Sequence, residues 1–183
     1  MSKYLATMLV VPAALLLVGA VEPQADPVPV RVALAAAERA PLRVALDLAR
    51  GRRWELGWDA LVAYDLATGE IIRTVRLPGA TFSAARGACL PDMLLGRSGA
   101  VLVSSNAQPR LWRVNPARFE VEIIDVVPAD DQDKDFGFSR LAWGANESTL
   151  QAVNTPLGTA WKIDLGTLAA KRLDASAAGQ CAS

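Results

Sequence analysis

Three carboxylates at alternate positions are the strongest candidate for chemistry in this sequence. Asp131, Asp133 and Asp135 lie in the stretch DDQDKDFG. Calcium loops place oxygen ligands at alternate residues and follow them with a glycine that permits a sharp turn. Here Phe136 stands where that glycine belongs, and Ala142 occupies the position of the late bidentate carboxylate. Two interpretations therefore remain. The stretch is either a calcium site, which would make calcium the one candidate cofactor, or a charged, solvated turn that leads into a strand. We favour the turn.

A second polar cluster lies in the stretch SSNAQPRLW, between two apolar segments. Loops of this kind carry ligand-binding side chains in many folds. A serine nucleophile needs a base beside it, and no histidine or nearby lysine is available in the sequence, so we predict no catalytic residue here. The alternatives are a polar binding surface and a plain connection between strands. The candidate ligand-binding residues are Ser104, Ser105, Asn106, Gln108 and Arg110.

The chain contains no histidine. This composition excludes Ser-His-Asp and Cys-His nucleophile systems, histidine-ligated zinc or haem, and a histidine general base. Any enzymatic activity would have to depend on carboxylates, lysine, tyrosine or a bound cofactor.

The elements that must position these side chains repeat along the chain. Segments 61–75, 111–126 and 160–173 each show alternating apolar residues, then Asp65, Asn115 or Asp164, a turn and a second short strand. Looser copies of the preceding strand pair occur at 43–60, 93–106 and 140–154. Trp112 and Trp161 hold the same place in successive units, which predicts packing between neighbouring sheets. The sequence therefore predicts three units of four antiparallel strands, near residues 42–77, 90–127 and 138–174.

These units resemble the blades of β-propellers. The piece VAYDLATGEIIRTVRLPG (62–79) is similar to the blade hairpin of bacterial YVTN-type repeats, and residues 137–165 resemble blades of NHL and SMP-30-like propellers. The resemblance implies an all-β, propeller-like domain over residues 41–175, with three four-stranded blades of about 50 residues. Closed propellers usually have about four to eight blades. Three alternatives follow: a degenerate fourth blade, for which PVPVRVAL (27–34) is the candidate, association of chains, or an open array of stacked sheets. An open array would leave strand edges exposed, so we favour a small or incomplete propeller, with self-association as the next choice.

The first twenty residues have the pattern of a secretory signal peptide. Lys3 precedes an almost wholly apolar stretch, and small residues end at Ala20. The apolar stretch is short for a bilayer span of about 20 residues, although an uncleaved anchor is the alternative. We expect a periplasmic or secreted protein without membrane attachment after cleavage, a Pro/Ala-rich linker over residues 21–40 and a tail over 176–183.

Two cysteines, Cys89 and Cys181, are the only ones in the chain. In an exported protein this count favours one disulfide between them. Closing a loop of about 90 residues would stabilise the fold by about 4–5 kcal/mol in the chain-entropy model. Two unpaired thiols, or pairing between chains, are the alternatives.

The charge balance bears on partners. Without residues 1–20 the chain carries 18 basic and 19 acidic residues, and no basic cluster, which argues against nucleic acid as a partner. Trp54 and Trp58 lie beside two arginines and form either an exposed aromatic-basic patch or edge packing. We interpret the protein as an exported, non-catalytic binding or scaffold module for an unknown protein or small molecule. The alternative is a metal-dependent propeller enzyme of the lactonase or hydrolase type.

Overall fold

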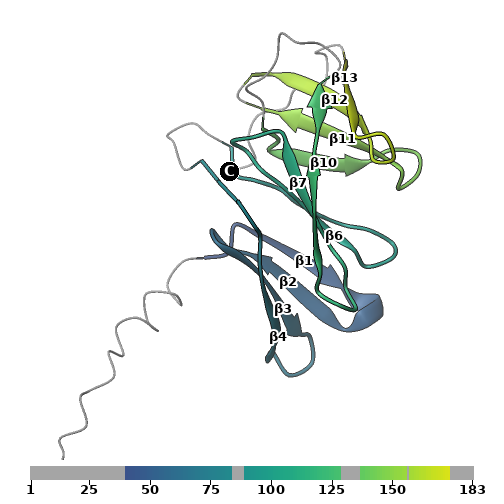
Figure 1. The fold of residues 1–183 in the computed structure, drawn as a ribbon. Coiled ribbons are helices and arrows are strands. Elements are labelled where there is room, and N and C mark those ends of the chain that lie inside the picture. Colours follow the sequence, from purple (N-terminus) through teal and green to yellow (C-terminus); the bar gives the residue numbers. More distant parts are fainter. Residues whose placement is uncertain (1–39, 84–88, 129–136, 156, 174–183) are drawn as a thin grey trace, which may run out of the picture. The chain divides into compact units, whose positions relative to one another are not determined.

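The computed structural model describes residues 40–83, 89–128, 137–155 and 157–173. Within these residues the chain forms short strands joined by tight turns (Figure 1). The first sheet has the order β1-β2-β3-β4 and is antiparallel throughout. Its strands are β1 (Arg43–Asp47), β2 (Arg52–Leu56), β3 (Ala60–Asp65) and β4 (Ile71–Arg76), with the one-turn 3-10 helix η1 (Leu48–Arg50) between β1 and β2.

The second and third sheets repeat this up-and-down order. The second contains β5 (Met93–Leu95), β6 (Val101–Ser104), β7 (Arg110–Val114) and β8 (Val121–Asp125). The third contains β10 (Arg140–Trp143), β11 (Thr149–Asn154), β12 (Thr159–Asp164) and β13 (Ala169–Leu173). The three predicted four-stranded antiparallel units are therefore confirmed, and we call them blades 1, 2 and 3.

One strand departs from the prediction. β9 (Val127–Pro128) pairs in parallel with β13 and makes blade 3 five-stranded. The chain leaving β8 passes along the outer edge of blade 3, where the Val127 N–H donates to the Leu168 carbonyl at 3.0 Å. Pro128 has no N–H to continue the ladder, so the added strand stays short. It covers part of an edge that would otherwise present free backbone groups.

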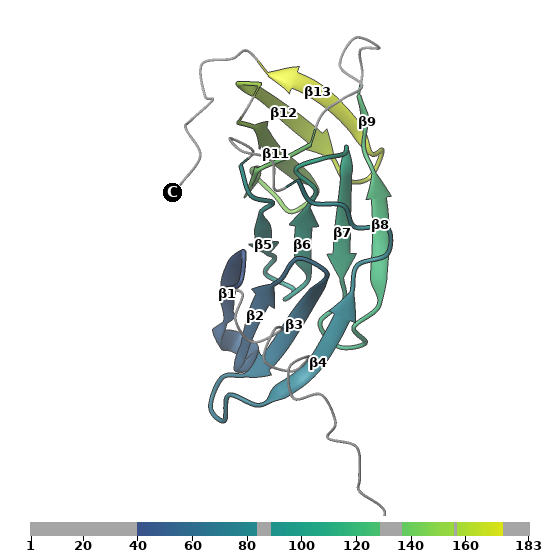
Figure 2. The same cartoon turned by 90° about the vertical axis from the view of Figure 1, so that its left-hand side faces the viewer.

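The blades are stacked in chain order, with blade 2 between the other two (Figure 2). One apolar core joins blades 1 and 2, and a second joins blades 2 and 3. β6 is buried on both sides, so its sequence reads Val-Leu-Val-Ser without polar alternation. The first strand of each blade is the innermost: β1 contacts β5, and β5 contacts β10.

Tryptophans fill both cores. Trp54 and Trp112 belong to the first core and Trp161 to the second, each almost fully buried, which confirms packing between blades for Trp112 and Trp161. The Trp112 indole N–H donates to the Pro78 carbonyl at 2.9 Å. Trp54 is buried and Trp58 is packed against the first core, so the aromatic-basic surface patch considered for them is wrong.

The same side-chain turn closes the last hairpin of every blade. Oδ1 of Asp65, Asn115 and Asp164 each accepts two backbone N–H groups from the residues two and three positions later, at 2.8–3.0 Å. Asx turns of this kind favour Asp and Asn at the first turn position. The equivalence of these three residues was predicted from their spacing, and the structure confirms it.

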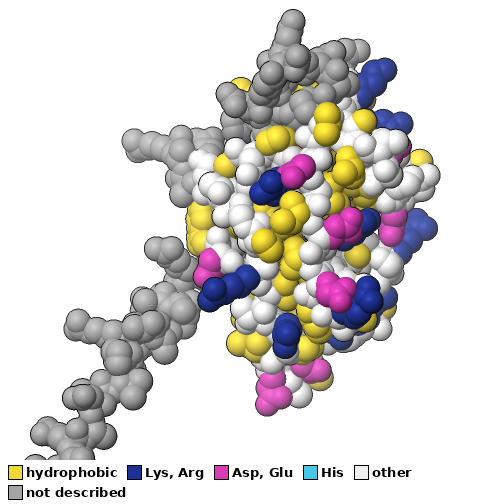
Figure 3. Space-filling view, in the orientation of Figure 1, with side chains coloured by type: hydrophobic (Ala, Val, Ile, Leu, Met, Phe, Trp, Pro, Cys, Tyr) yellow, Lys and Arg dark blue, Asp and Glu magenta, His cyan; other side chains and the backbone are white. Residues whose placement is uncertain are grey.

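Several predictions concern residues outside the described part of the chain. These are the signal peptide (1–20), the linker up to residue 39, the candidate fourth-blade segment (27–34), Asp131, Asp133 and Asp135, Cys181 and the tail. Among the residues that the structure describes, no helix is long and apolar enough to cross a membrane. On the face shown in Figure 3, cationic and anionic side chains lie beside each other rather than in a patch of one sign.

Candidate functional site

Three equivalent positions lie at the heads of the inner strands: Arg43 and Arg140 begin β1 and β10, and Asp92 directly precedes β5. Each pairs with a residue at or next to the end of the following strand in its blade: Arg43 with Leu56, Asp92 with Ser104 through the Ser104 N–H (2.9 Å), and Arg140 with Val153. Because the blades are stacked, these three charged residues follow one another along the inner strands.

Asp92 connects all three blades. Its Oδ1 lies 3.3 Å from Nε of Arg43 in blade 1 and accepts the Met93 N–H at 2.9 Å. Its Oδ2 accepts the Leu141 N–H of blade 3 at 2.8 Å. Both carboxylate oxygens therefore have donors, and the negative charge is compensated inside the protein.

A cavity of about 360 Å³ opens beside Asp92, on the side of blade 3 that faces away from blade 2. We call it the inner-strand cleft. This volume is at the lower end of the range for small-molecule sites. Its lining residues are Asp92, Arg140, Leu141, Ala142, Gln151 and Val153.

Arg140 and Gln151 supply the free polar groups of the cleft. Both are exposed, and within the described part of the chain neither makes a hydrogen bond or an ion pair with another side chain. A guanidinium presents donors in a planar fork that matches a carboxylate, and a neighbouring amide adds a further donor. The arrangement can hold an anionic group beside Arg140, because the Asp92 carboxylate that also lines the cleft already has its own donors.

The predicted ligand-binding residues at 104–110 lie together, but their side chains bond to the protein itself. Ser104 Oγ donates to the Phe138 carbonyl at 2.7 Å and accepts the Asp92 N–H at 2.8 Å. Ser105 Oγ donates to the Thr81 carbonyl at 2.8 Å. Both serines are fully buried. These bonds tie blade 2 to the segments that connect it with blades 1 and 3.

Asn106 makes the densest set of these contacts. Its Nδ2 donates to the carbonyls of Ser83 (2.8 Å) and Cys89 (2.7 Å), and its Oδ1 accepts the Ser83 N–H at 2.8 Å. The amide thus satisfies backbone groups of Ser83 and Cys89.

Gln108 and Arg110 complete the predicted set. Gln108 Nε2 donates to the Gly79 carbonyl at 3.1 Å, and Arg110 Nε donates to Asp125 Oδ1 at 2.6 Å. The hydrogen bond to Asp125 raises the pKa of the Arg110 guanidinium above its ordinary value. All five residues therefore have structural partners, and a contact of this loop with a ligand stays a prediction.

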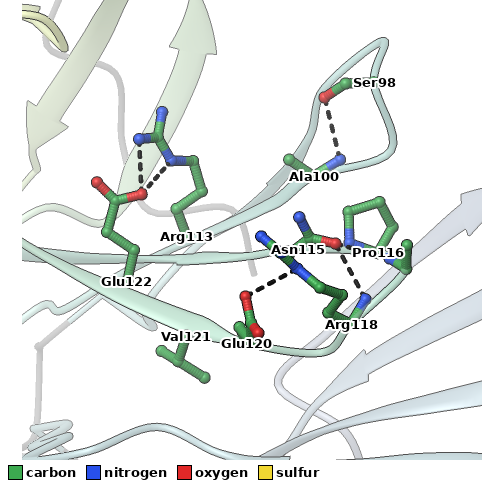
Figure 4. Close-up of a pocket in the computed structure, with 10 residues that line it drawn as sticks. Ser98, Ala100, Arg113, Asn115, Pro116, Arg118, Glu120, Val121 and Glu122 are labelled. Atoms are coloured by element: carbon green, nitrogen blue, oxygen red, sulfur yellow. Dashed lines mark hydrogen bonds and ion pairs between the residues drawn. The ribbon is translucent and has the colours of Figure 1, made fainter.

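A second cavity, of about 480 Å³, lies at the β7–β8 hairpin (Figure 4). Its charged residues pair with each other: Arg113 with Glu122 at 2.6 Å and Arg118 with Glu120 at 2.9 Å. Asn115 Oδ1 is occupied by the turn described above. Because the charges are matched within one exposed hairpin, this cavity leaves less for a ligand to bind than the inner-strand cleft does.

The metal and disulfide predictions are not decided by the described residues. Among these residues no group of three His, Cys, Asp or Glu side chains could hold a metal ion, and the predicted calcium ligands lie outside them. Cys89 is buried and is not a free thiol. Its predicted partner Cys181 also lies outside the described residues, so the Cys89–Cys181 pairing stays a prediction.

No protein-family model and no curated protein matches this sequence. Solved structures do match the fold. Hydrazine synthase from Kuenenia stuttgartiensis matches with a TM-score of 0.52 and 13% identity, over 72% of this chain and 34% of that one. The extracellular domain of the putative one-component system BT4673 from B. thetaiotaomicron matches with a TM-score of 0.50 and 15% identity, over 75% of this chain and 17% of that one.

Both neighbours are propeller-type folds, which agrees with the three blades. This chain spans about a third or less of the length of these neighbours. At such identities the likeness shows the fold alone, so the site rests on the geometry of this chain.

Sequence reasoning missed the residues at the heads of the inner strands. Arg43, Asp92 and Arg140 are 49 and 48 residues apart, within one residue of the spacing of Asp65, Asn115 and Asp164. Aligning the first strand of each blade, rather than only the last hairpin, would have brought them together.

Proposed function

We propose that this protein is an exported, non-catalytic binding module that holds a small ligand or a partner side chain by an anionic group in the inner-strand cleft. The observation that carries the proposal is Arg140. Its exposed guanidinium has no carboxylate partner among the described residues, whereas its equivalents Arg43 and Asp92 pair with each other at 3.3 Å.

The remaining features support the same proposal. Gln151 stands in the cleft beside Arg140, and Val153 adds an apolar side chain to the same side of the sheet. Support for export comes from the predicted signal peptide and from the fold likeness to an extracellular domain. The absence of histidine from the chain favours binding over catalysis.

The test uses protein purified after export to the periplasm of a bacterial host. Succinate is titrated by calorimetry, with the uncharged succinamide as the matched ligand. We expect succinate to bind, succinamide to bind at least about tenfold more weakly, and the succinate affinity to fall with added salt.

Arg140→Gln tests the residue. Hydrogen bonds to charged groups contribute about 1.5–3 kcal/mol, so this change should weaken succinate binding about tenfold or more. Arg97→Gln, which alters an exposed arginine between β5 and β6 of blade 2, is the control and should leave binding unchanged. Equal binding of succinate and succinamide, or full binding by Arg140→Gln, would contradict the proposal.

A further inference from the structure

Each blade is a sheet with two sides. In blade 2 one side faces blade 1 and the other faces blade 3. In blade 2 the side toward blade 1 carries the cross-strand row Met93–Val103–Trp112, which lies in the first core. The equivalent row in blade 3, Leu141–Ala152–Trp161, lies in the second core. In blade 1 the register places Val44, Glu55 and Val62 at these positions.

The neighbouring row on the same side follows the same rule. Leu95–Val101–Val114–Val121 in blade 2 and Trp143–Leu150–Ile163–Ala170 in blade 3 pack against the preceding blade. Blade 1 has Leu46, Arg53, Tyr64 and Ile71 there. We call this side of blade 1 the leading face.

The leading face carries large apolar side chains, as the packed faces of blades 2 and 3 do, although no described residue covers it. Val44, Leu46 and Ile71 are 51%, 52% and 61% exposed. Leaving such side chains in water costs free energy that contact with another blade would recover. A set of large apolar side chains on one sheet face indicates an interaction surface rather than an ordinary solvent face.

Two charges near the middle of the leading face, Arg53 and Glu55, lie beside each other. Arg53 Nε lies 3.0 Å from Glu55 Oε1, and the guanidinium lies 4.6 Å from the centroid of the Tyr64 ring. The Arg53 Nε–H is buried but makes no aligned hydrogen bond in the structure. The leading face therefore has a polar centre, in which the Arg53 Nε–H lacks an aligned acceptor, and apolar side chains around it.

The opposite end of the stack has a complementary composition. The side of blade 3 that faces away from blade 2, which we call the trailing face, carries the row Val153–Ala160–Leu173. This row is equivalent to Leu56–Leu61–Val75 of blade 1, which is buried against blade 2. The trailing face thus also keeps an apolar row of the kind that packs on a following blade.

Each of the two faces has polar residues at a few positions that are apolar in the packed blades, and these positions lie opposite each other when the faces are packed. The trailing face has Gln151 and Lys162 at the positions of Trp54 and Ala63. Trp54 and Ala63 belong to the same core as Val101 and Val103, whose equivalents on the leading face are Arg53 and Glu55. If the two faces pack as blades 1 and 2 do, Gln151 and Lys162 meet the Arg53–Glu55 pair, and Lys162 supplies the opposite charge to Glu55.

We infer that the leading face of one copy packs on the trailing face of a second copy, and the reverse, to form a closed six-bladed ring with two-fold symmetry. Propellers typically close with about four to eight blades. One copy supplies three blades and three copies would supply nine, so two copies fit this range. Closure covers the exposed apolar side chains of the leading face and the exposed Gln151 and Lys162 of the trailing face at once, as expected for a symmetric dimer.

Closure has one electrostatic consequence, which rests on the proposed function and concerns Arg140 alone, since Gln151 and Val153 of the cleft face the second copy in the ring and no longer line an open cleft. Arg140 then approaches Arg43 of the second copy, as Arg43 approaches Asp92 within one chain. Two like charges repel, and a carboxylate bound at Arg140 would neutralise them. Succinate should therefore tighten the dimer, and succinamide should not.

The test measures molar mass by light scattering on a sizing column, with the exported protein over a hundredfold range of concentration. We expect a dimer that dissociates to monomer on dilution. Leu46→Glu and Ile71→Glu should each raise the dissociation constant at least tenfold. Leu157→Glu, which alters an equally exposed apolar residue outside both faces, should not.

A charge exchange separates association from a folding defect. Glu55→Lys and Lys162→Glu, which lie in different blades, should each weaken the dimer, and the double variant should restore it. A monomer under all conditions, a trimer or open polymer, or a dimer insensitive to Leu46→Glu would overturn the ring. Succinate binding to such a monomer would leave the proposed function standing. A dimer with equal mass in succinate and succinamide would support the ring and contradict the anion link.

Discussion

Gly137 lies directly against the backbone of Asn106. A Cβ at position 137 would stand 2.3 Å from the carbonyl carbon of Asn106 and 2.6 Å from the amide nitrogen of Ala107. The next residue, Phe138, donates its N–H to the Ser105 carbonyl at 2.6 Å. The chain entering blade 3 is therefore held at backbone contact distance from blade 2, where a side chain cannot fit.

Gly137→Ala should lower the free energy of unfolding by about 3 kcal/mol, since the added methyl group meets backbone atoms that cannot move aside. Urea denaturation followed by tryptophan fluorescence measures this change. At Gly57 the nearest atom to an added Cβ is the Ala60 carbonyl oxygen at 3.4 Å. Gly57→Ala should therefore stay within about 0.5 kcal/mol of the wild type. Equal effects of the two substitutions would refute the close approach.

Asn106→Asp should destabilise the fold by about 3 kcal/mol. The carboxylate cannot donate to the Ser83 and Cys89 carbonyls that Nδ2 now satisfies, and it places a negative charge beside them. Gln108→Glu removes a single exposed hydrogen bond and should cost less than about 1 kcal/mol. Thermal unfolding of both variants checks this. Unchanged stability of Asn106→Asp, together with loss of ligand binding, would instead favour the ligand-binding interpretation of this loop.

The stability of the protein should depend on pH through two of the three Asx turns, those of Asp65 and Asp164. Backbone N–H donors from Thr68 and Ala67 hold the pKa of Asp65 below its ordinary value, and those from Thr167 and Gly166 do the same for Asp164. A carboxyl whose pKa is lower in the folded state stabilises the fold above its unfolded pKa, and this contribution is lost as the pH falls through the folded pKa.

The double variant Asp65→Asn, Asp164→Asn keeps the acceptor oxygens, as Asn115 does naturally, and removes the titration. Between about pH 5 and pH 2.5 the wild type should lose more unfolding free energy than this variant. Urea denaturation at both pH values gives the comparison. Asp59→Asn, at an exposed loop carboxylate, is the control, and a pH response of the double variant equal to that of the wild type would contradict the assignment.

Reduction should destabilise the protein if Cys89 and Cys181 are joined. Cys181→Ser should lower the unfolding free energy by up to about 4–5 kcal/mol, and dithiothreitol should lower the melting temperature of the wild type only. Peptide mapping without reductant identifies the linked peptides. A wild type that carries free thiols after purification from the periplasm would rule the pairing out.

Calcium should leave the protein unchanged if the Asp131–Asp135 stretch is only a solvated turn, which is the interpretation we favour. The melting temperature is compared in calcium and in chelator. A calcium-dependent rise that disappears in the triple variant Asp131→Asn, Asp133→Asn, Asp135→Asn would establish the site, because ligand binding to the native state raises stability by mass action.

The sequence by itself determined the local architecture. Alternating apolar residues determine which side of a strand faces a core. Asp65, Asn115 and Asp164 predict their turns, because the hydrogen bonds that they accept come from residues two and three positions away. Blade number and approximate blade boundaries followed from these signals, because each depends only on neighbours within a few residues.

Only the tertiary structure decided what these elements do together. Asp92 bonds to Arg43 and Leu141, each 49 residues away, and nothing local to Asp92 distinguishes it from a solvated loop carboxylate. Ser104 and Asn106 have the composition of a binding loop, but connecting segments from both neighbouring blades use their hydrogen bonds. Apolar residues such as Leu46 follow the same alternation in every blade, so their exposure is decided by which blade lies next to them, and sequence periodicity cannot specify that neighbour.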